Sequence, residues 1–158
     1  MSKARQTVRA LDEIVWTVSP RNDALPRSAS YFSHTVSDLL QGTGIRCRLR
    51  IPDELPEARL TSKSRHQVLL AVKEAVRNVI KHSGASELQF ALDATGQELT
   101  ISIRDNGKGF DPGAAGLERN GLFNMPRRLE ELGGRFQLES EPGKGTSVVF
   151  TVPMNQEK

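Results

Sequence analysis

The stretch Asp105–Phe110, with the sequence DNGKGF, places a carboxylate beside two glycines. It follows an alternating apolar run at 99–103, which predicts a strand. Such a string often forms a hairpin turn, because Asn and Gly adopt positive φ cheaply. Residues 111–121, however, have loop composition and no period of two, so no second strand is expected there. A carboxylate that accepts from an exocyclic amine, beside glycines that admit close backbone approach, equally suits a nucleotide pocket.

A second group of polar residues lies on a predicted helix at Thr61–His82. Apolar residues recur in it at helical spacing, at Val68, Ala71, Val72, Ala75, Val76 and Val79. Glu74, Asn78 and His82 are four apart and form one column, with Lys81 beside it. A solvated face is the ordinary interpretation, but Asn in mid-helix competes for backbone hydrogen bonds. A carboxylate, an amide oxygen and a cation in one column suit a Mg²⁺–phosphate group, since Mg²⁺ keeps several waters.

These two stretches resemble motifs of the histidine-kinase ATPase domain. Residues 74–83 resemble its N box, and residues 105–110 resemble its G1 box. Asn120–Met125 resembles the G2 box, and Gly143–Thr146 resembles the glycine-rich turn that leads into a late strand. The four motifs stand in the family's order across about residues 45–153. The K-H-S ending of the N box and the short lid resemble the NarL-type branch of sensor kinases.

The resemblance implies a role for each of these residues in binding ATP and Mg²⁺. Asn78 would coordinate Mg²⁺, and Glu74 would be the catalytic residue that orients water or the incoming nucleophile. Asp105 would accept from the adenine amino group, with Thr146 supporting that contact through water. The other residues that the resemblance assigns to ATP binding are Lys81, His82, Gly107, Lys108, Gly109, Phe110, Arg119, Gly121 and Leu122.

Several of these positions have a second interpretation or depart from the family's pattern. His82 is equally well explained as a cation near the carbonyl groups of a helix end. Gly143–Thr146 also makes a simple hairpin turn. Arg119 stands where the G2 box usually has its first glycine, and would either stiffen the lid or contact phosphate. Pro126 fits a helix only in its first turn, so we expect that helix to begin near Asn124.

The elements that must position these residues predict an α/β (α+β) sandwich. We expect a mixed, mostly antiparallel sheet covered on one face by helices, and the resemblance implies the Bergerat-type ATPase fold. The expected strands lie near 45–51, 87–94, 98–104, 135–140 and 146–152, with a turn at Gly96. The expected helices lie near 3–18, 26–40, 61–82 and 124–132, and residues 111–119 form a mobile lid.

The expected strand at 45–51 alternates apolar residues with arginines. Ile45, Cys47, Leu49 and Ile51 form its apolar side, so a strand with one buried face is predicted. Cys47 is the single cysteine of the chain, which excludes an internal disulfide and fits a reducing cytoplasm. We expect its thiol to be buried and inert.

Length and charge limit the remaining possibilities. The 158 residues suit one domain, with residues 1–20 as the end of a dimerisation helix or a linker and residues 21–158 as the ATP-binding catalytic domain. The formal net charge of +3 is too small to indicate nucleic acid. No apolar run approaches membrane length, so we expect no membrane contact by this chain. The expected location is cytoplasmic, including the cytoplasmic part of a membrane-bound sensor.

Residues 11–20 resemble the end of the second dimerisation helix of sensor kinases. The family's phosphoacceptor is a His followed by an acidic residue, and none of His34, His66 and His82 has that setting. We therefore expect a catalytic domain that donates the γ-phosphoryl group of ATP to a histidine on the dimerisation domain of the same kinase, with a response regulator downstream. Two alternatives remain, a non-catalytic nucleotide-binding regulatory module and an anti-sigma-type serine kinase of the same fold. The helix around Trp16 favours the sensor kinase over the serine kinase.

Overall fold

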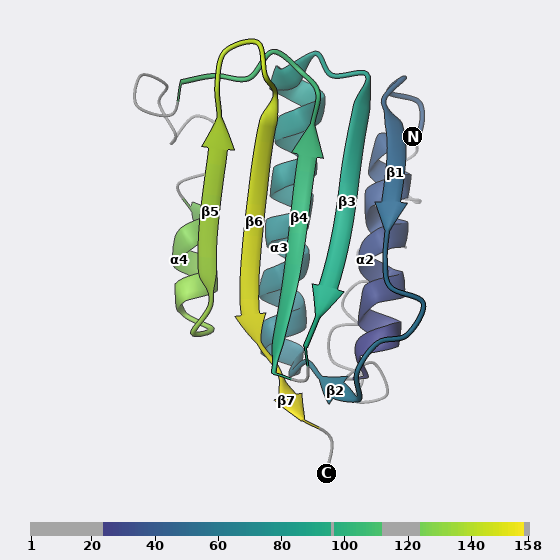
Figure 1. Cartoon of the computed structure of the whole chain (residues 1–158), viewed down its shortest axis with the longest axis vertical. Helices are drawn as coiled ribbons and strands as arrows, with labels where there is room; N and C mark the ends of the chain where they lie inside the picture. The colour runs from purple at the N-terminus through teal and green to yellow at the C-terminus, as the bar shows by residue number, and fades with distance from the viewer. Residues whose placement is uncertain (1–23, 96, 112–123, 157–158) are drawn as a thin grey trace, which may run out of the picture.

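The computed structural model describes residues 24–95, 97–111 and 124–156. Within these ranges, helices cover one face of a five-stranded sheet, as predicted (Figure 1). The helices are α2 (Leu25–Leu40), α3 (Ser62–Asn78), the π-helix η2 (Val79–Ser83) and α4 (Asn124–Glu130). The sheet consists of β1 (Arg46–Arg50), β3 (Glu87–Ala94), β4 (Glu98–Asp105), β5 (Arg135–Ser140) and β6 (Thr146–Pro153). A small separate pair, β2 (Ala58–Arg59) with β7 (Asn155–Gln156), was not predicted.

The strand order of the large sheet is β1-β3-β4-β6-β5. β1 runs parallel to β3, with α3 in the connection between them, and the other neighbouring strands are antiparallel. In this register Thr146 lies opposite Asp105 on β4 and opposite Ser140 on β5. Three polar residues from three strands therefore form one row at the end of the sheet.

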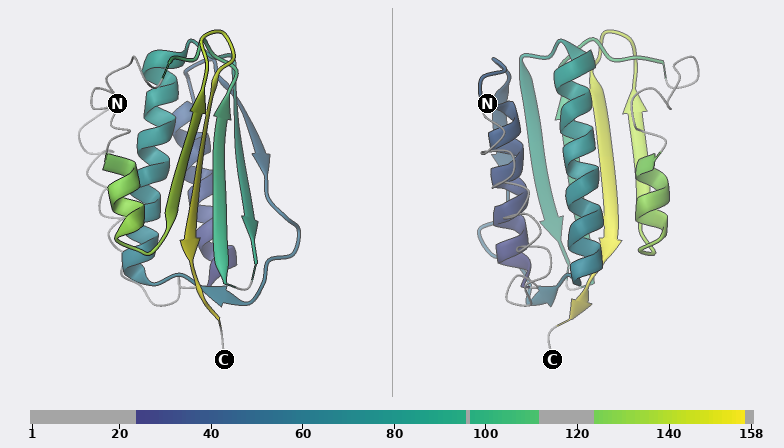
Figure 2. Two further views of the ribbon diagram at one scale, coloured as in Figure 1. Left: turned by 60° about the vertical axis from the view of Figure 1, so that its left-hand side comes forward. Right: turned by 180° about the vertical axis from the view of Figure 1, so that it is seen from behind.

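The core lies between the sheet and the helices, which Figure 2 shows on the same side of the strands. Strands β3, β4 and β6 contribute alternate residues to it, among them Phe90, Ile103 and Phe150. Helices α2 and α3 contribute the side chains that recur at helical spacing, including Phe32 and Val72. Each such side chain stabilises the fold by about 1.5–3 kcal/mol relative to an exposed one. No helix in the described ranges is long and apolar enough to cross a membrane.

The end of the predicted helix 61–82 differs from the expectation. Thr61 caps its start, since its hydroxyl accepts from the backbone N–H of Ser64 (3.1 Å). The α-helix ends at Asn78, however, and the chain continues as the π-helix η2. Gly84 then terminates the element in a left-handed conformation, with φ of 63°. The extra residue per turn alters the stagger that was expected between Asn78 and His82.

The prediction of one buried face for the strand at 45–51 is partly wrong. Ile45, Cys47 and Ile51 are half-buried, whereas Leu49 is 49% exposed. The reason is that β1 is an edge strand, with a neighbouring strand on one side only. Cys47 is thus half-buried rather than buried, but burial still raises the pKa of its thiol, which keeps the reactive thiolate scarce.

The other face of β1 carries Arg46, Arg48 and Arg50, all exposed. Arg48 forms an ion pair with Glu87 of the adjacent strand. Among the described elements, no helix covers this second face of the sheet (Figure 2). The arginines therefore border an uncovered sheet surface.

The ends of the other helices and strands lie close to their expected positions. α2 begins one residue early, with Pro26 in its first turn, and β4 extends by one residue to Asp105. α4 ends at Glu130, earlier than expected, and Gly133 follows in a turn with φ of 78°. Pro126 lies in the first turn of α4 as described. The predicted helix at 3–18, the turn at Gly96 and most of the lid lie outside the described residues.

Candidate functional site

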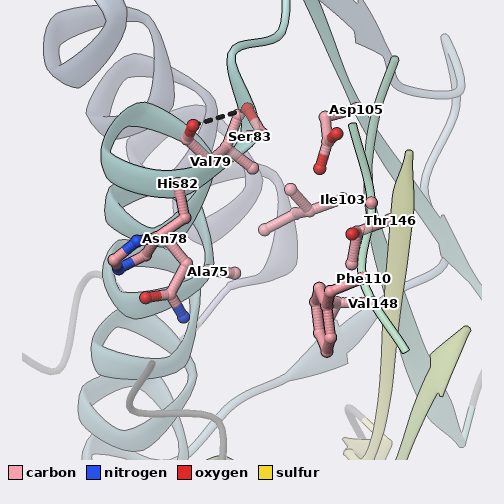
Figure 3. Close-up of a pocket in the computed structure, with 11 residues that line it drawn as sticks. Ala75, Asn78, Val79, His82, Ser83, Ile103, Asp105, Phe110, Thr146 and Val148 are labelled. Atoms are coloured by element: carbon pink, nitrogen blue, oxygen red, sulfur yellow. Dashed lines mark hydrogen bonds between the residues drawn. The ribbon is translucent and has the colours of Figure 1, made fainter. Parts of the chain in front are cut away.

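A pocket of about 490 Å³, a volume that includes space open to solvent, lies between the C-terminal part of α3, η2 and the ends of β4 and β6 (Figure 3). Apolar side chains form much of the wall, and these are Ala75, Val79, Ile103, Phe110 and Val148. The polar residues that line it are Asn78, His82, Ser83, Asp105 and Thr146, and Gly109 lines it too. A largely apolar pocket with a few convergent polar groups suits an aromatic ligand that carries polar substituents.

Asp105 is the ionisable residue buried deepest in this pocket. It is the last residue of β4, and only 6% of it is exposed. Burial raises the pKa of its carboxyl group, and hydrogen bonds from the backbone N–H groups of Gly107 (2.8 Å) and Thr146 partly oppose that rise. A carboxylate in this setting gains from a ligand that donates a hydrogen bond, because such a donor replaces lost water.

The glycines that follow Asp105 permit close approach between loops of the protein itself. A Cβ atom on Gly107 would overlap the carbonyl oxygen of Ser83. Gly109 has φ of 64°, and a Cβ atom there would overlap the carbonyl oxygen of Glu141. The glycine spacing thus allows the loop after β4 to pack between the end of η2 and the turn that joins β5 to β6.

Hydrogen bonds fix the loop after β4 to the end of η2. The side-chain oxygen of Asn106 accepts from the backbone N–H groups of Ser86 and Glu87, both at 3.0 Å. The backbone N–H of Lys108 donates to the carbonyl oxygen of Ser83 (2.8 Å). These contacts hold the stretches that resemble the N box and the G1 box against one another.

Asn78 and His82 lie on the helical wall of the pocket, opposite Asp105 and Thr146 (Figure 3). The side-chain nitrogen of Asn78 is buried and has no hydrogen-bond partner in the described part of the chain. A buried polar atom without a partner is unusual, and a ligand that accepts a hydrogen bond in the pocket would satisfy it. His82 lines the same pocket but is exposed, so it borders the opening.

The structure brings together six of the predicted site residues, and these are Asn78, His82, Asp105, Gly109, Phe110 and Thr146. Four others do not line the pocket: Glu74 and Lys81 on the helix, and Gly107 and Lys108 in the loop. Arg119, Gly121 and Leu122 lie outside the described residues.

Two serines of the site were not predicted as site residues. Ser83 lines the pocket, and its hydroxyl donates to the carbonyl oxygen of Val79 (2.6 Å). Ser140 lies behind Thr146, with 2.8 Å between the two hydroxyl oxygens. Ser83 ends the K-H-S string of the stretch that resembles the N box, so that motif could have indicated it. No local sequence pattern indicates Ser140, because only the strand register places it beside Thr146.

A sequence model described as "Histidine kinase-, DNA gyrase B-, and HSP90-like ATPase" matches residues 64–156. A sensor-like histidine kinase of Chloroflexus aurantiacus is 36% identical over 107 residues, which cover 64% of this chain and 18% of that protein. The histidine kinase/phosphatase DegS of Bacillus subtilis is 32% identical over 105 residues, 65% of this chain and 27% of DegS. The chain thus spans between 18% and 27% of these two relatives.

Solved structures show the same fold. The histidine kinase domain of the Erythrobacter litoralis EL346 blue-light-activated kinase aligns with a TM-score of 0.63 at 16% identity, covering 80% of this chain and 61% of that one. Full-length ShkA in complex with AMPPNP aligns with a TM-score of 0.66 at 18% identity, covering 80% of this chain and 30% of ShkA. The family match over residues 64–156, the shared fold and the pocket agree, and the chain belongs to the histidine kinase-, DNA gyrase B- and HSP90-like ATPase family.

Proposed function

We propose that this chain provides the ATP-binding catalytic domain of a sensor histidine kinase of the NarL-type branch, comprising residues 21–158. It donates the γ-phosphoryl group of ATP to a histidine on the dimerisation domain of the same kinase, and a response regulator acts downstream, in the cytoplasm. One observation carries the proposal: a buried carboxylate, Asp105, faces Asn78 across a largely apolar pocket, and the side-chain nitrogen of Asn78 has no hydrogen-bond partner among the described residues.

The adenine ring would occupy the part of the pocket near the sheet. Its amino group would donate to the carboxylate of Asp105, which has little other access to water. Thr146 would support that contact from the adjacent strand. Phe110, Ile103 and Val148 offer apolar surface to the faces of the ring.

The phosphates would lie toward the helical wall and the opening. An amide oxygen is a suitable Mg²⁺ ligand, so the side-chain oxygen of Asn78 would hold the ion. Its side-chain nitrogen, which has no hydrogen-bond partner among the described residues, would donate to a phosphate oxygen. When bound, Mg²⁺ neutralises charge on the phosphates. His82 at the opening and the exposed Lys81 would add positive charge near the phosphate oxygens.

Further roles are proposed for residues outside the pocket wall. Glu74 lies one turn before Asn78 on the same helix and is half-exposed, from where it would orient the incoming nucleophile. Gly107 and Lys108 form the loop beside the pocket. Arg119, Gly121 and Leu122 would complete the phosphate site from the lid.

The names of the relatives favour a histidine kinase over the two alternatives. DegS is named a histidine-protein kinase/phosphatase, and LiaS of Bacillus subtilis, 37% identical over 87 residues that cover 55% of this chain and 24% of LiaS, is named a sensor histidine kinase. Neither name supports a serine kinase or a module without catalysis.

A phosphotransfer experiment tests the proposal. The chain is incubated with γ-labelled ATP and Mg²⁺, alone and with a dimerisation-domain fragment that carries an acceptor histidine. We expect no label on the chain alone, and acid-labile, base-stable label on the fragment, because positioning and charge compensation are the main demands of phosphoryl transfer. Acid-stable label would instead support the serine kinase, and nucleotide binding with no transfer to any fragment would support the regulatory module.

A further inference from the structure

Ser140 occupies a position from which it can control the hydroxyl group of Thr146. It is the last residue of β5 and pairs with Thr146, which in turn pairs with Asp105 of β4. Asp105 and Thr146 point into the pocket from the same wall (Figure 3). Ser140 stands one strand further out, with its oxygen 2.8 Å from the hydroxyl oxygen of Thr146.

The hydroxyl group of Ser140 makes two more contacts, which determine where its proton lies. Its oxygen accepts from the backbone N–H of Phe110 (2.9 Å). It also lies 3.1 Å from the carbonyl oxygen of Gly145, and a carbonyl oxygen can only accept. A serine hydroxyl has one proton and two lone pairs. All three contacts are satisfied together only when Ser140 donates to Gly145, accepts from Phe110 and accepts the hydroxyl proton of Thr146.

This arrangement decides what Thr146 offers to a ligand. Its single hydroxyl proton points toward Ser140, so only lone pairs remain for the pocket. The neighbouring carboxylate of Asp105 is also an acceptor when ionised. This wall of the pocket therefore presents acceptors to the ligand. At position 6 a 6-aminopurine brings N–H donors to such a wall, whereas a 6-oxopurine brings lone pairs that face other lone pairs.

We propose that Ser140 is a specificity-determining residue: by accepting the proton of Thr146, it makes the pocket select 6-aminopurine over 6-oxopurine nucleotides. The inference rests on the proposed function and extends it, since it concerns the same pocket. Without Ser140, the hydroxyl group of Thr146 is free to rotate and donate to a 6-oxo group. Selectivity then depends on Asp105 alone.

The test compares the dissociation constants of ADP and IDP, whose bases carry a 6-amino or a 6-oxo group and differ also in the proton on N1 of the 6-oxopurine. Calorimetry on the parent chain and on Ser140→Ala gives the ratio Kd(IDP)/Kd(ADP). We expect the ratio to fall by about five- to tenfold in Ser140→Ala, the size of one hydrogen bond gained or lost. Ser140→Thr keeps the hydroxyl group and should keep the parent's ratio. Ser102→Ala, which removes a half-buried hydroxyl group from β4 outside the pocket, is the matched control and should also keep it.

The same substitution made in a Thr146→Val variant separates this role of Ser140 from simple packing. In Thr146→Val there is no hydroxyl proton to orient, so adding Ser140→Ala should leave the ratio unchanged. Circular dichroism checks the fold of each variant, and Ser140→Cys, with a much weaker acceptor, replaces Ser140→Ala if the alanine variant does not fold. Equal loss of ADP and IDP affinity in Ser140→Ala would overturn the inference and leave the proposed function intact. A parent chain that binds neither nucleotide would overturn both.

Discussion

Asp105 combines a negative charge with burial, and two consequences follow for the residue. Burial raises the pKa of its carboxyl group, with hydrogen bonds from Gly107 and Thr146 as a smaller opposing effect. A ligand donor relieves the cost of burying the charge, so the carboxylate contributes to binding. Without a ligand the same charge lowers the stability of the fold.

Asp105→Asn should weaken ADP binding by about 1–3 kcal/mol, because a buried acceptor of the ligand's amino group is replaced in part by a donor. Isothermal titration calorimetry of the parent and the variant measures this loss. Equal affinities would show that adenine does not bind at Asp105.

The pH dependence of stability gives a second view of Asp105. Because its pKa is higher in the folded than in the unfolded chain, its contribution to stability is present below the unfolded pKa and is lost as pH rises through the folded pKa. The free energy of unfolding of the parent relative to Asp105→Asn should therefore fall as pH rises above about 4, the ordinary pKa of an Asp carboxyl group. Urea unfolding of both proteins across this range measures the difference, and a rise with pH would contradict the predicted direction.

Asn78→Ala should remove the part of ATP binding that depends on Mg²⁺ and affect metal-free ADP binding less. The amide nitrogen of Asn78 makes no hydrogen bond within the described residues, so the loss of this atom breaks no hydrogen bond among them. Calorimetry with ATP analogue and Mg²⁺, and with ADP and a chelator, separates the two parts. Equal loss for both ligands would indicate a packing role.

At the scale of elements, the loop after β4 depends on how closely it approaches η2. Lys108 and Asn106 form hydrogen bonds to residues at the end of that helix and just beyond it. The approach is close enough that a Cβ atom on Gly107 has no space beside Ser83. The loop after β4 and the end of η2 therefore form one unit, and a substitution that moves one of them displaces the other.

Gly107→Ala should destabilise the fold by about 1–3 kcal/mol, since the added methyl group forces backbone to shift. Gly42→Ala is the matched control, because Gly42 has φ of 81° with nothing within 4 Å of the added atom, so only conformational strain acts there. Nucleotide affinity should fall in Gly107→Ala alone. Denaturant unfolding and calorimetry measure both effects, and unchanged affinity in Gly107→Ala would show that the pocket does not depend on this contact.

The sequence predicts the long elements well because each has a strong period. Alternation predicts β3 to within its observed bounds, and Thr61 marks the start of α3. The π-helix has no comparable signal, since the same residues suit an α-helix. The exposure of Leu49 depends on strand order, which only the folded sheet defines. In the site, Asp105 and Asn78 belong to contiguous motifs, whereas Ser140 reaches Thr146 through a register that no local pattern encodes.

The whole molecule is two-layered within the described residues, with helices on one face of the sheet and an uncovered polar face on the other (Figure 2). The sheet ends at β1 on one side and at β5 on the other. Such edges present unpaired backbone groups to solvent. Among the described strands, β1 and β5 are therefore the two places where a further strand could add to the sheet.

The arginines of β1 affect how this protein behaves at high concentration. Two copies pairing through β1 would bring Arg46, Arg48 and Arg50 of each copy onto neighbouring strands about 4.8 Å apart. Only Arg48 has an ion-pair partner in the described residues, Glu87, so repulsion between the copies would oppose fibre-like growth from this edge. Salt shortens the range of that repulsion to about 3 Å at about 1 M, so colloidal stability at this edge depends on ionic strength. Dilute salt therefore preserves the repulsion between two copies at this edge, and concentrated salt screens it.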